Sequence, residues 1–281
     1  MLQNQKFLIG EFLLSLTFYY LIYTLCREVW NDLNRRQINS WRLTLIIGSR
    51  CADGVVLIAD RIVTTQSDGL GFYCTDKLFS VLEHAVIGSS GSSGNFELFR
   101  NHVLSYINRK STKVSADDIL LTLSNQTYHL NERYRGRNSN AIFDILLGRA
   151  YQDRPSTLTY VNSYGLPNSE EGYRIIGSGT RYAKVFLQRM WNRDMPMGKV
   201  AELGYFAIRY IEQLKLDHTV GLGGQKPQIW YMPDNYKEND EKDITFGIDR
   251  LANDQELQIL ESRVKEKVKR FDDYLAALFK D

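Results

Sequence analysis

The sequence has few cysteines and histidines, and this scarcity excludes several kinds of site. Its 281 residues include three cysteines (Cys26, Cys51 and Cys74) and four scattered histidines, with no C-x-x-C or other ligand spacing. We therefore expect no metal site and no cofactor. The odd number of unpatterned cysteines predicts a reducing, cytoplasmic setting.

A strong charge of one sign is also missing. The formal net charge is +2, from 35 Lys and Arg against 33 Asp and Glu. That balance gives no electrostatic basis for binding nucleic acid or an anionic membrane surface. With 43% hydrophobic and 24% charged residues, the composition is typical of a globular protein that is long enough to bury one sizeable core.

A long apolar run occurs at the amino terminus. Residues 7–26 carry one charge, Glu11, and are long enough to span a bilayer as a helix. One lysine precedes the run and no A-x-A-like cleavage site follows it, so it is a poor signal peptide. Three interpretations of residues 1–43 stay open: a membrane anchor through residues 7–26, with the body in the cytoplasm; a removable leader or propeptide; or sequence upstream of the true start.

From residue 44 to residue 281 the periodicity predicts one folded domain. Residues 44–49 and 55–61 are β-branched and aliphatic runs that flank Asp53-Gly54, a strong hairpin signal. Further strands are predicted at 77–82, 84–88, 141–150, 157–163, 173–176, 228–232 and 244–248. Helices are predicted at about 96–107, 115–130, 181–191, 199–214 and 257–275.

The order of these elements decides the fold class. Helices come in pairs between groups of strands, which does not match alternating βαβ units. Two stacked antiparallel sheets with a helical layer on each outer side fit the order. We therefore predict an α+β protein with a four-layer αββα sandwich.

Several short motifs lie in a specific order along this domain. They are Thr44-Leu-Ile-Ile-Gly48, Asp53-Gly54 leading to Asp60-Arg61, Lys77-Leu-Phe79, the glycine-rich stretch 88–94, Gly177-Ser178-Gly179 and Asp217. In order and spacing they resemble the β-type subunits of the proteasome, which are N-terminal-nucleophile hydrolases. The resemblance implies a threonine-type endopeptidase that cuts unfolded protein or peptides in a 20S-like core. It also implies a ring-forming oligomer, built from this chain or with other proteasome-type subunits.

The resemblance assigns Thr44 as the nucleophile. A threonine hydroxyl is a weak nucleophile and needs a base, and in this family the base is the threonine's own α-amino group. Thr44 must then be the first residue of the mature chain. Lys77 would lower the pKa of this pair by its positive charge, and Asp60 would neutralise and orient the lysine.

The remaining assignments also come from the resemblance. The Gly91 amide would stabilise the oxyanion, and Ser178 and Asp217 would support the terminal amine. Thr64 would pair with the substrate backbone as an added strand. Ser89 and Ser93 fall where side chains shape the specificity pocket.

Two departures from the family pattern bear on activity. Leu43 precedes Thr44, where self-processing precursors carry glycine, and residues 217–224 lack the serine expected before Gly223-Gly224. Translation from codon 43 would resolve the first departure, since trimming the initiator Met exposes Thr44. A non-catalytic subunit that keeps its extension is the alternative. Within the enzyme class, hydrolysis of other amides and acyl transfer to an amine stay open.

Overall fold

The computed structural model describes residues 44–65, 71–82, 84–91, 93–109, 116–135, 143–234 and 250–278. The chain forms two five-stranded antiparallel sheets and a small two-stranded ribbon. In spatial order, the first sheet contains β10 (Tyr173–Gly177), β1 (Leu45–Cys51), β2 (Gly54–Ala59), β11 (Gln228–Pro233) and β12 (Arg250–Leu251). The second contains β5 (Leu78–Leu82), β6 (Ala85–Ser90), β7 (Asp144–Arg149), β8 (Thr157–Val161) and β9 (Pro167–Glu170).

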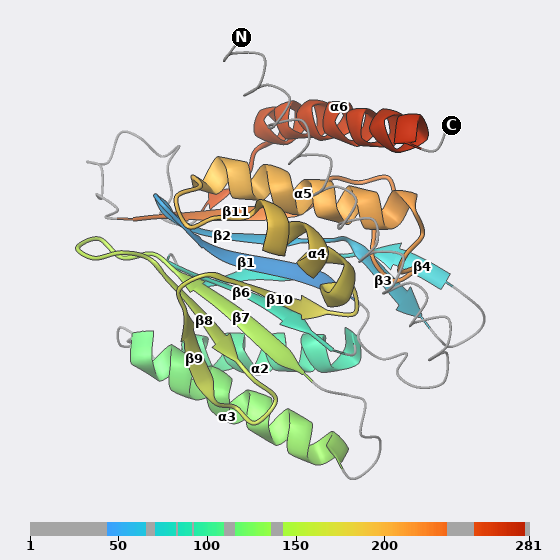
Figure 1. Cartoon of the computed structure of the whole chain (residues 1–281). Helices are drawn as coiled ribbons and strands as arrows, with labels where there is room; N and C mark the ends of the chain where they lie inside the picture. Colours follow the sequence, from blue (N-terminus) through green and yellow to red (C-terminus); the bar gives the residue numbers. More distant parts are fainter. Residues whose placement is uncertain are drawn as a thin grey trace.

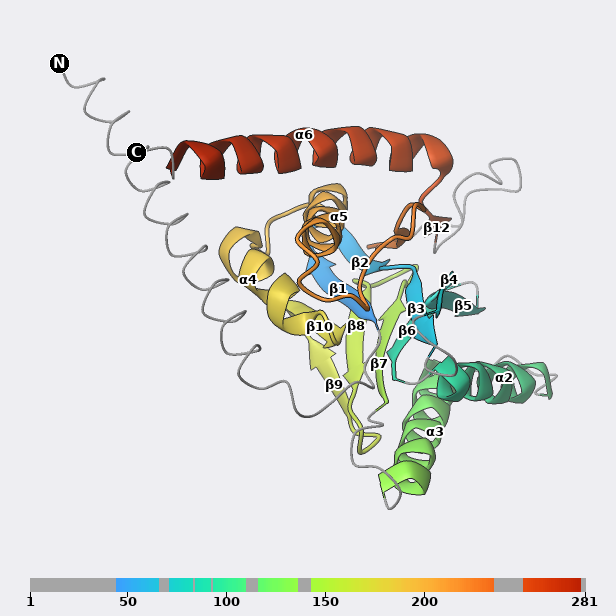
Figure 2. The same cartoon turned by 90° about the vertical axis from the view of Figure 1, so that its right-hand side faces the viewer.

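Helices cover the outer face of each sheet (Figures 1 and 2). The second sheet is covered by α2 (Ser93–Arg109) and α3 (Ala116–Arg135), and the first by α4 (Thr180–Met190) and α5 (Met197–Gln213). The predicted four-layer αββα sandwich is therefore confirmed. The last helix, α6 (Asp254–Leu278), lies outside α5, so this side of the molecule has an additional layer (Figure 1).

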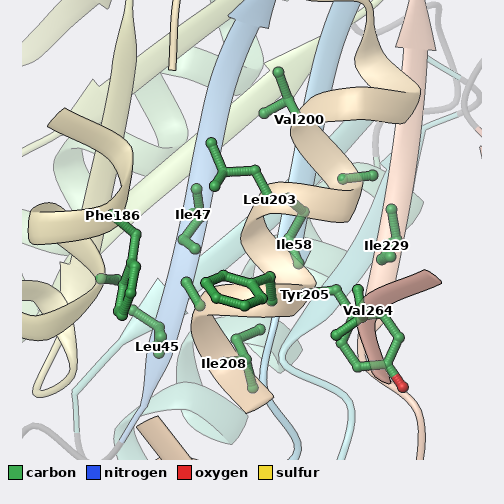
Figure 3. Close-up of a cluster of buried hydrophobic side chains, with 14 of the residues drawn as sticks. Leu45, Ile47, Ile58, Phe186, Val200, Leu203, Tyr205, Ile208, Ile229 and Val264 are labelled. Atoms are coloured by element: carbon green, nitrogen blue, oxygen red, sulfur yellow. The ribbon is translucent and has the colours of Figure 1, made fainter. Parts of the chain in front are cut away.

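Side chains along the β1–β2 hairpin alternate between the two faces of the first sheet, so they belong to separate parts of the core. Leu45, Ile47 and Ile58 pack toward α4 and α5, together with Phe186 (Figure 3). Ile46 and its neighbours on the opposite face pack between the two sheets. Since successive strand residues point to opposite faces, β1 and β2 are buried on both sides. This burial holds the ends of the hairpin, where the candidate site lies, in fixed positions.

The structure departs from the sequence prediction in several places. The predicted strand 84–88 extends to Ser90 in β6 and α2 begins at Ser93, so the glycine-rich stretch 88–94 is shared between a strand and a helix. Four strands were not predicted: β9, the short β12, and the two-stranded ribbon of β3 (Ile62–Thr65) and β4 (Gly71–Cys74). The predicted strand at 244–248 and the apolar run at 7–26 lie outside the described residues. Within the described ranges, no helix combines the length and apolarity needed to cross a bilayer.

Candidate active site

Three of the predicted side chains meet at one edge of the sandwich. Thr44 directly precedes β1, Asp60 directly follows β2, and Lys77 directly precedes β5. The hydroxyl Oγ1 of Thr44 donates to Asp60 Oδ1 over 3.1 Å, and Lys77 Nζ donates to the same oxygen over 2.6 Å. All three residues are buried. One carboxylate oxygen therefore connects the hydroxyl and the ammonium.

The Asp60 carboxylate also accepts backbone hydrogen bonds. Leu45 N donates to Oδ1 over 2.8 Å, and Gly221 N donates to Oδ2 over 3.2 Å. Burial raises the pKa of Asp60, and the charge of Lys77 opposes that change. Burial likewise lowers the pKa of Lys77, against the attraction of Asp60. Lys77 therefore loses its proton more readily than a lysine in water, which suits a group beside a proton-transfer step.

A second network connects Ser178 and Asp217 through Thr219, a residue that the sequence analysis did not identify. Ser178 Oγ donates to the Thr44 carbonyl oxygen over 3.3 Å and lies 2.7 Å from Thr219 Oγ1. Thr219 Oγ1 in turn donates to Asp217 Oδ1 over 2.6 Å. Thr219 therefore supplies a hydroxyl in the stretch where the family pattern led us to expect a serine. Its only sequence signal is the short Asp217-His-Thr219 turn, in which the carboxylate also accepts the Thr219 N–H.

Gly177 shapes the space around the Thr44 backbone. Its φ of +102° is in the region that favours glycine. A Cβ at this position would lie 2.0 Å from the Thr44 carbonyl oxygen. The end of β10 must therefore be glycine for Thr44 and Ser178 to approach each other. This requirement gives a physical reason for the first glycine of the Gly177-Ser178-Gly179 motif.

The second sheet brings the predicted oxyanion and pocket residues to the same edge. Leu78 pairs with Gly88, so Lys77 lies at the end of the sheet where β6 runs out through Ser89 to Gly91. Ser89 is buried, and its hydroxyl has no hydrogen-bond partner in the described part of the chain. The role of Gly91 as an oxyanion donor stays a prediction.

The other two predicted substrate contacts are placed only by their backbone. Thr64 lies in β3 and pairs with Phe72 of β4, while Ser93 is the first residue of α2. Their side chains are outside the described residues, so their roles stay predictions.

The buried thiol of Cys51 is a second nucleophile type in the described part of the chain. Burial raises the pKa of the Cys51 thiol to about 12, so this thiol stays protonated near neutral pH. Within the described ranges, no three His, Cys, Asp or Glu side chains gather as metal ligands. The Thr44 hydroxyl, in contrast, donates a hydrogen bond to the Asp60 carboxylate.

Comparisons with solved structures agree with this fold. The chain is similar to Anbu (ancestral beta-subunit) from Yersinia bercovieri, with 15% identity and a TM-score of 0.60 over 81% of this chain and 97% of that one. The Anbu (Gly-1) mutant from Hyphomicrobium sp. strain MC1 gives a TM-score of 0.58, also at 15% identity, over 81% of this chain and 95% of that one. At this identity the similarity establishes the fold.

Sequence comparisons establish the family. The chain is 25% identical to proteasome subunit beta 1 of Thermococcus kodakarensis, over 72% of this chain and 94% of that protein. It is also 25% identical to proteasome subunit alpha of Methanococcus vannielii, over 62% of this chain and 67% of that protein. The family model for the proteasome subunit matches residues 44–218, which is more than half of the chain. The chain that places Thr44, Asp60 and Lys77 together is thus a member of the proteasome subunit family.

Proposed function

We propose that the chain is a threonine-type endopeptidase subunit in which Thr44 becomes the N-terminal nucleophile. The observation that carries the proposal is the buried contact of the Thr44 hydroxyl with Asp60, which is also bound by Lys77. Burying a lysine and a carboxylate costs free energy. A catalytic site can use the buried lysine's charge to lower the pKa of the nucleophile beside it. Family membership supports the same chemistry.

In the proposed reaction the free α-amino group of Thr44 is the general base. It takes the proton from Oγ1 as the oxygen forms a bond to the substrate carbonyl carbon. The amide C–N bond then breaks, and the proton passes to the leaving amine. Water hydrolyses the resulting ester and restores the hydroxyl. Lys77 stabilises the deprotonated form of the pair by its charge, and Asp60 holds Lys77 in place.

The surrounding groups have supporting parts in this proposal. The Gly91 amide would donate to the oxyanion, a contribution of about 3 kcal/mol in well-studied enzymes. Ser178 and Asp217, joined through Thr219, would hold the Thr44 backbone and its amine. Thr64 would pair with the substrate backbone as an added strand, while Ser89 and Ser93 would line the specificity pocket.

Family membership supports the substrate and the setting that we propose. We assign unfolded protein or peptides as substrates, cut inside a ring that this chain forms with itself or with other proteasome-type subunits. Enclosure in a ring limits access to chains that can enter it, so a site with little sequence preference would not damage folded proteins. The proposed location is the cytoplasm.

A non-catalytic subunit that keeps residues 1–43 is the second candidate. Two observations favour it: Leu43 rather than glycine precedes Thr44, and the relatives include alpha as well as beta subunits at similar identity. An amide-linked Thr44 has no free amine to act as a base. The two candidate functions therefore differ in whether the peptide bond between Leu43 and Thr44 is cut.

The deciding experiment is intact-mass analysis and N-terminal sequencing of the protein isolated from its native source. A mature chain that begins at Thr44 is expected for the peptidase. A chain that begins at Met1 or at another residue before Thr44 would contradict it and leave the structural role. Expression of the Thr44→Ala variant tests whether the bond is cut by the chain itself, because self-cleavage requires the hydroxyl.

A further inference from the structure

An apolar groove lies on the outer helical side of the molecule. The end of α4, α5 and the C-terminal half of α6 enclose a volume of about 580 Å³. The apolar residues that line it are Met190, Met195, Leu203, Phe206, Phe271 and Tyr274. Met190, one of these lining residues, is 44% exposed. Because methionine side chains adapt to irregular shapes, this lining suits several apolar side chains of a peptide.

The rim of the groove is mainly basic. Lys199, Lys267 and Arg270 have side chains that are at least half exposed. Both lysines contact Glu202, and Arg270 contacts Glu266, so an incoming carboxylate would share these cations. Among the described residues of the lining, Glu202 is the one carboxylate, and it is buried under Lys267 with a 2.6 Å contact. The groove therefore suits an occupant with an apolar body and an acidic group at its edge.

The chain itself contains a segment of this chemistry. Residues 7–26 are apolar apart from Glu11. Neither the family match, which begins at residue 44, nor the proposed reaction uses these residues. Leaving such a run in water is unfavourable by about 25 cal/mol for each Å² of exposed apolar surface. A binding site on the body of the same protein would remove that penalty.

The distances allow this segment to reach the groove. Thr44 lies beside the start of α4, where Gly179 N donates to the Thr44 carbonyl oxygen. The end of α4 at Met190 is about 16 Å further along the helix axis. The linker of residues 27–43 can span about 55 Å when extended. The tether is therefore several times longer than the separation.

We propose that apolar side chains of residues 7–26 bind in the groove between α4, α5 and α6 of the same chain, with Glu11 at the basic rim. The groove holds a few side chains and not the whole segment. A short covalent tether gives an effective concentration in the millimolar range, which favours the chain's own segment over a second copy. The tether exists only while the 43–44 bond is intact, so the proposed contact is a property of the uncut chain.

Photo-crosslinking of the full chain tests the proposal. A benzoylphenylalanine replaces Met190, and the same group replaces Leu121 on α3 as the control, since Leu121 is 62% exposed on the opposite helical layer. In lipid-free buffer, the probe at Met190 should crosslink to peptides from residues 7–26 and the probe at Leu121 should not. An equal mixture of ¹⁵N-labelled and unlabelled chains identifies crosslinks within one chain, which carry a single label.

Three results would overturn the proposal: a mixed-label crosslink, which indicates a second copy; crosslinking of residues 7–26 equally from both probes; or no crosslink to these residues at all.

Phosphatidylcholine–phosphatidylglycerol vesicles test whether the segment prefers the groove or a bilayer. Loss of the Met190 crosslink when they are added would assign the segment to the membrane. Glu11→Arg and Arg270→Glu should each lower the yield about two- to threefold, as expected for a surface ion pair. The double swap should restore the yield, and failure to do so would contradict the placement of Glu11.

Discussion

The two ends of the β1–β2 hairpin each carry a charged pair, and the pairs differ in what surrounds them. At one end Lys77 binds Asp60 at 2.6 Å, with side chains that are 6% and 0% exposed. At the other end Arg50 binds Asp234 at 2.5 Å, with side chains that are 15% and 16% exposed. Arg50 also donates to the carbonyl oxygens of Cys51 and Gly54, so it holds the hairpin turn together.

The difference separates a structural ion pair from a candidate catalytic one. Arg50 has a permanently charged guanidinium, and the partners described for it fix the backbone. Lys77 has a pKa that burial lowers, and its partner Asp60 also accepts the Thr44 hydroxyl. Charge pairing alone therefore does not mark an active site. At the Lys77 end, a titratable cation, full burial and a nearby hydroxyl occur together, and our proposal of an active site there rests on this combination.

The largest effect is expected when Lys77 is replaced by Met. This change leaves Asp60 buried without its cation, which should lower the free energy of unfolding by about 3–5 kcal/mol. It should also slow acylation of a mature Thr44 by at least about a thousandfold, since the nucleophile loses its electrostatic support. Chemical denaturation and the rate of adduct formation with an electrophilic peptide measure the two quantities.

The double variant Asp60→Asn/Lys77→Met is the matched control for this prediction. It removes both charges, so stability should partly recover while acylation stays slow. Recovery of the acylation rate in the double variant would show that Lys77 contributes only to folding.

A smaller effect is expected from Thr219→Val, which keeps the side-chain shape and removes the hydroxyl. Ser178 and Asp217 would lose their shared partner, so the acylation rate should fall about 10- to 100-fold. The free energy of unfolding should fall by about 1–2 kcal/mol. Thr219→Ser keeps the hydroxyl and should retain most of the rate. Equal losses in Val and Ser variants would point to packing rather than to the hydrogen bonds.

At the opposite end, Arg50→Met should change stability without changing the chemistry. Loss of the hydrogen bonds to Asp234 and to the turn should cost about 1–3 kcal/mol of unfolding free energy. The acylation rate of Thr44 should stay within about twofold of the unmodified protein. A rate loss comparable to that of Lys77→Met would contradict the distinction between the two pairs.

Glu202, which binds Lys267 between α5 and α6, offers a third charged pair for comparison. Burial raises its pKa, but the hydrogen bond and charge of Lys267 and the charge of Lys199 outweigh burial, so the pKa lies below 4.5. A lowered carboxyl pKa stabilises the fold above pH 4.5, and this contribution is lost as the pH falls through the folded-state value. When the pH falls from 6 to 3, the free energy of unfolding of Glu202→Gln should therefore decrease by about 1 kcal/mol less than that of the unmodified protein. Identical pH profiles would contradict this account.

The sequence predicted best where regular patterns coincide with burial. The Asp53-Gly54 turn between two aliphatic runs predicted the central hairpin correctly. In contrast, β9 reads Pro-Asn-Ser-Glu and is largely exposed at a sheet edge, so it has no apolar alternation to detect. The predicted strand 84–88 stopped at Gly88 because glycine and serine favour turns, yet β6 continues through Ser89 and Ser90.

The candidate site shows the same limit. Thr44, Asp60 and Lys77 were predicted to act together from the resemblance to proteasome β-type subunits, and each adjoins the end of a strand in the structure. Thr219 was not, because it lies in a loop without periodicity. Only the folded chain brings it to Ser178, which lies 41 residues earlier. Hydrogen bonds between distant loops leave no local pattern in the sequence.

The most direct test of the central claim is mass spectrometry of the native-source protein after treatment with an electrophilic peptide, such as a peptide epoxyketone or boronate. The account predicts one adduct per chain on a mature N-terminal Thr44, and none on Thr44→Ala produced in the same source. A mature protein with a free Thr44 that forms no adduct, or an adduct on another residue that persists in Thr44→Ala, would contradict the account.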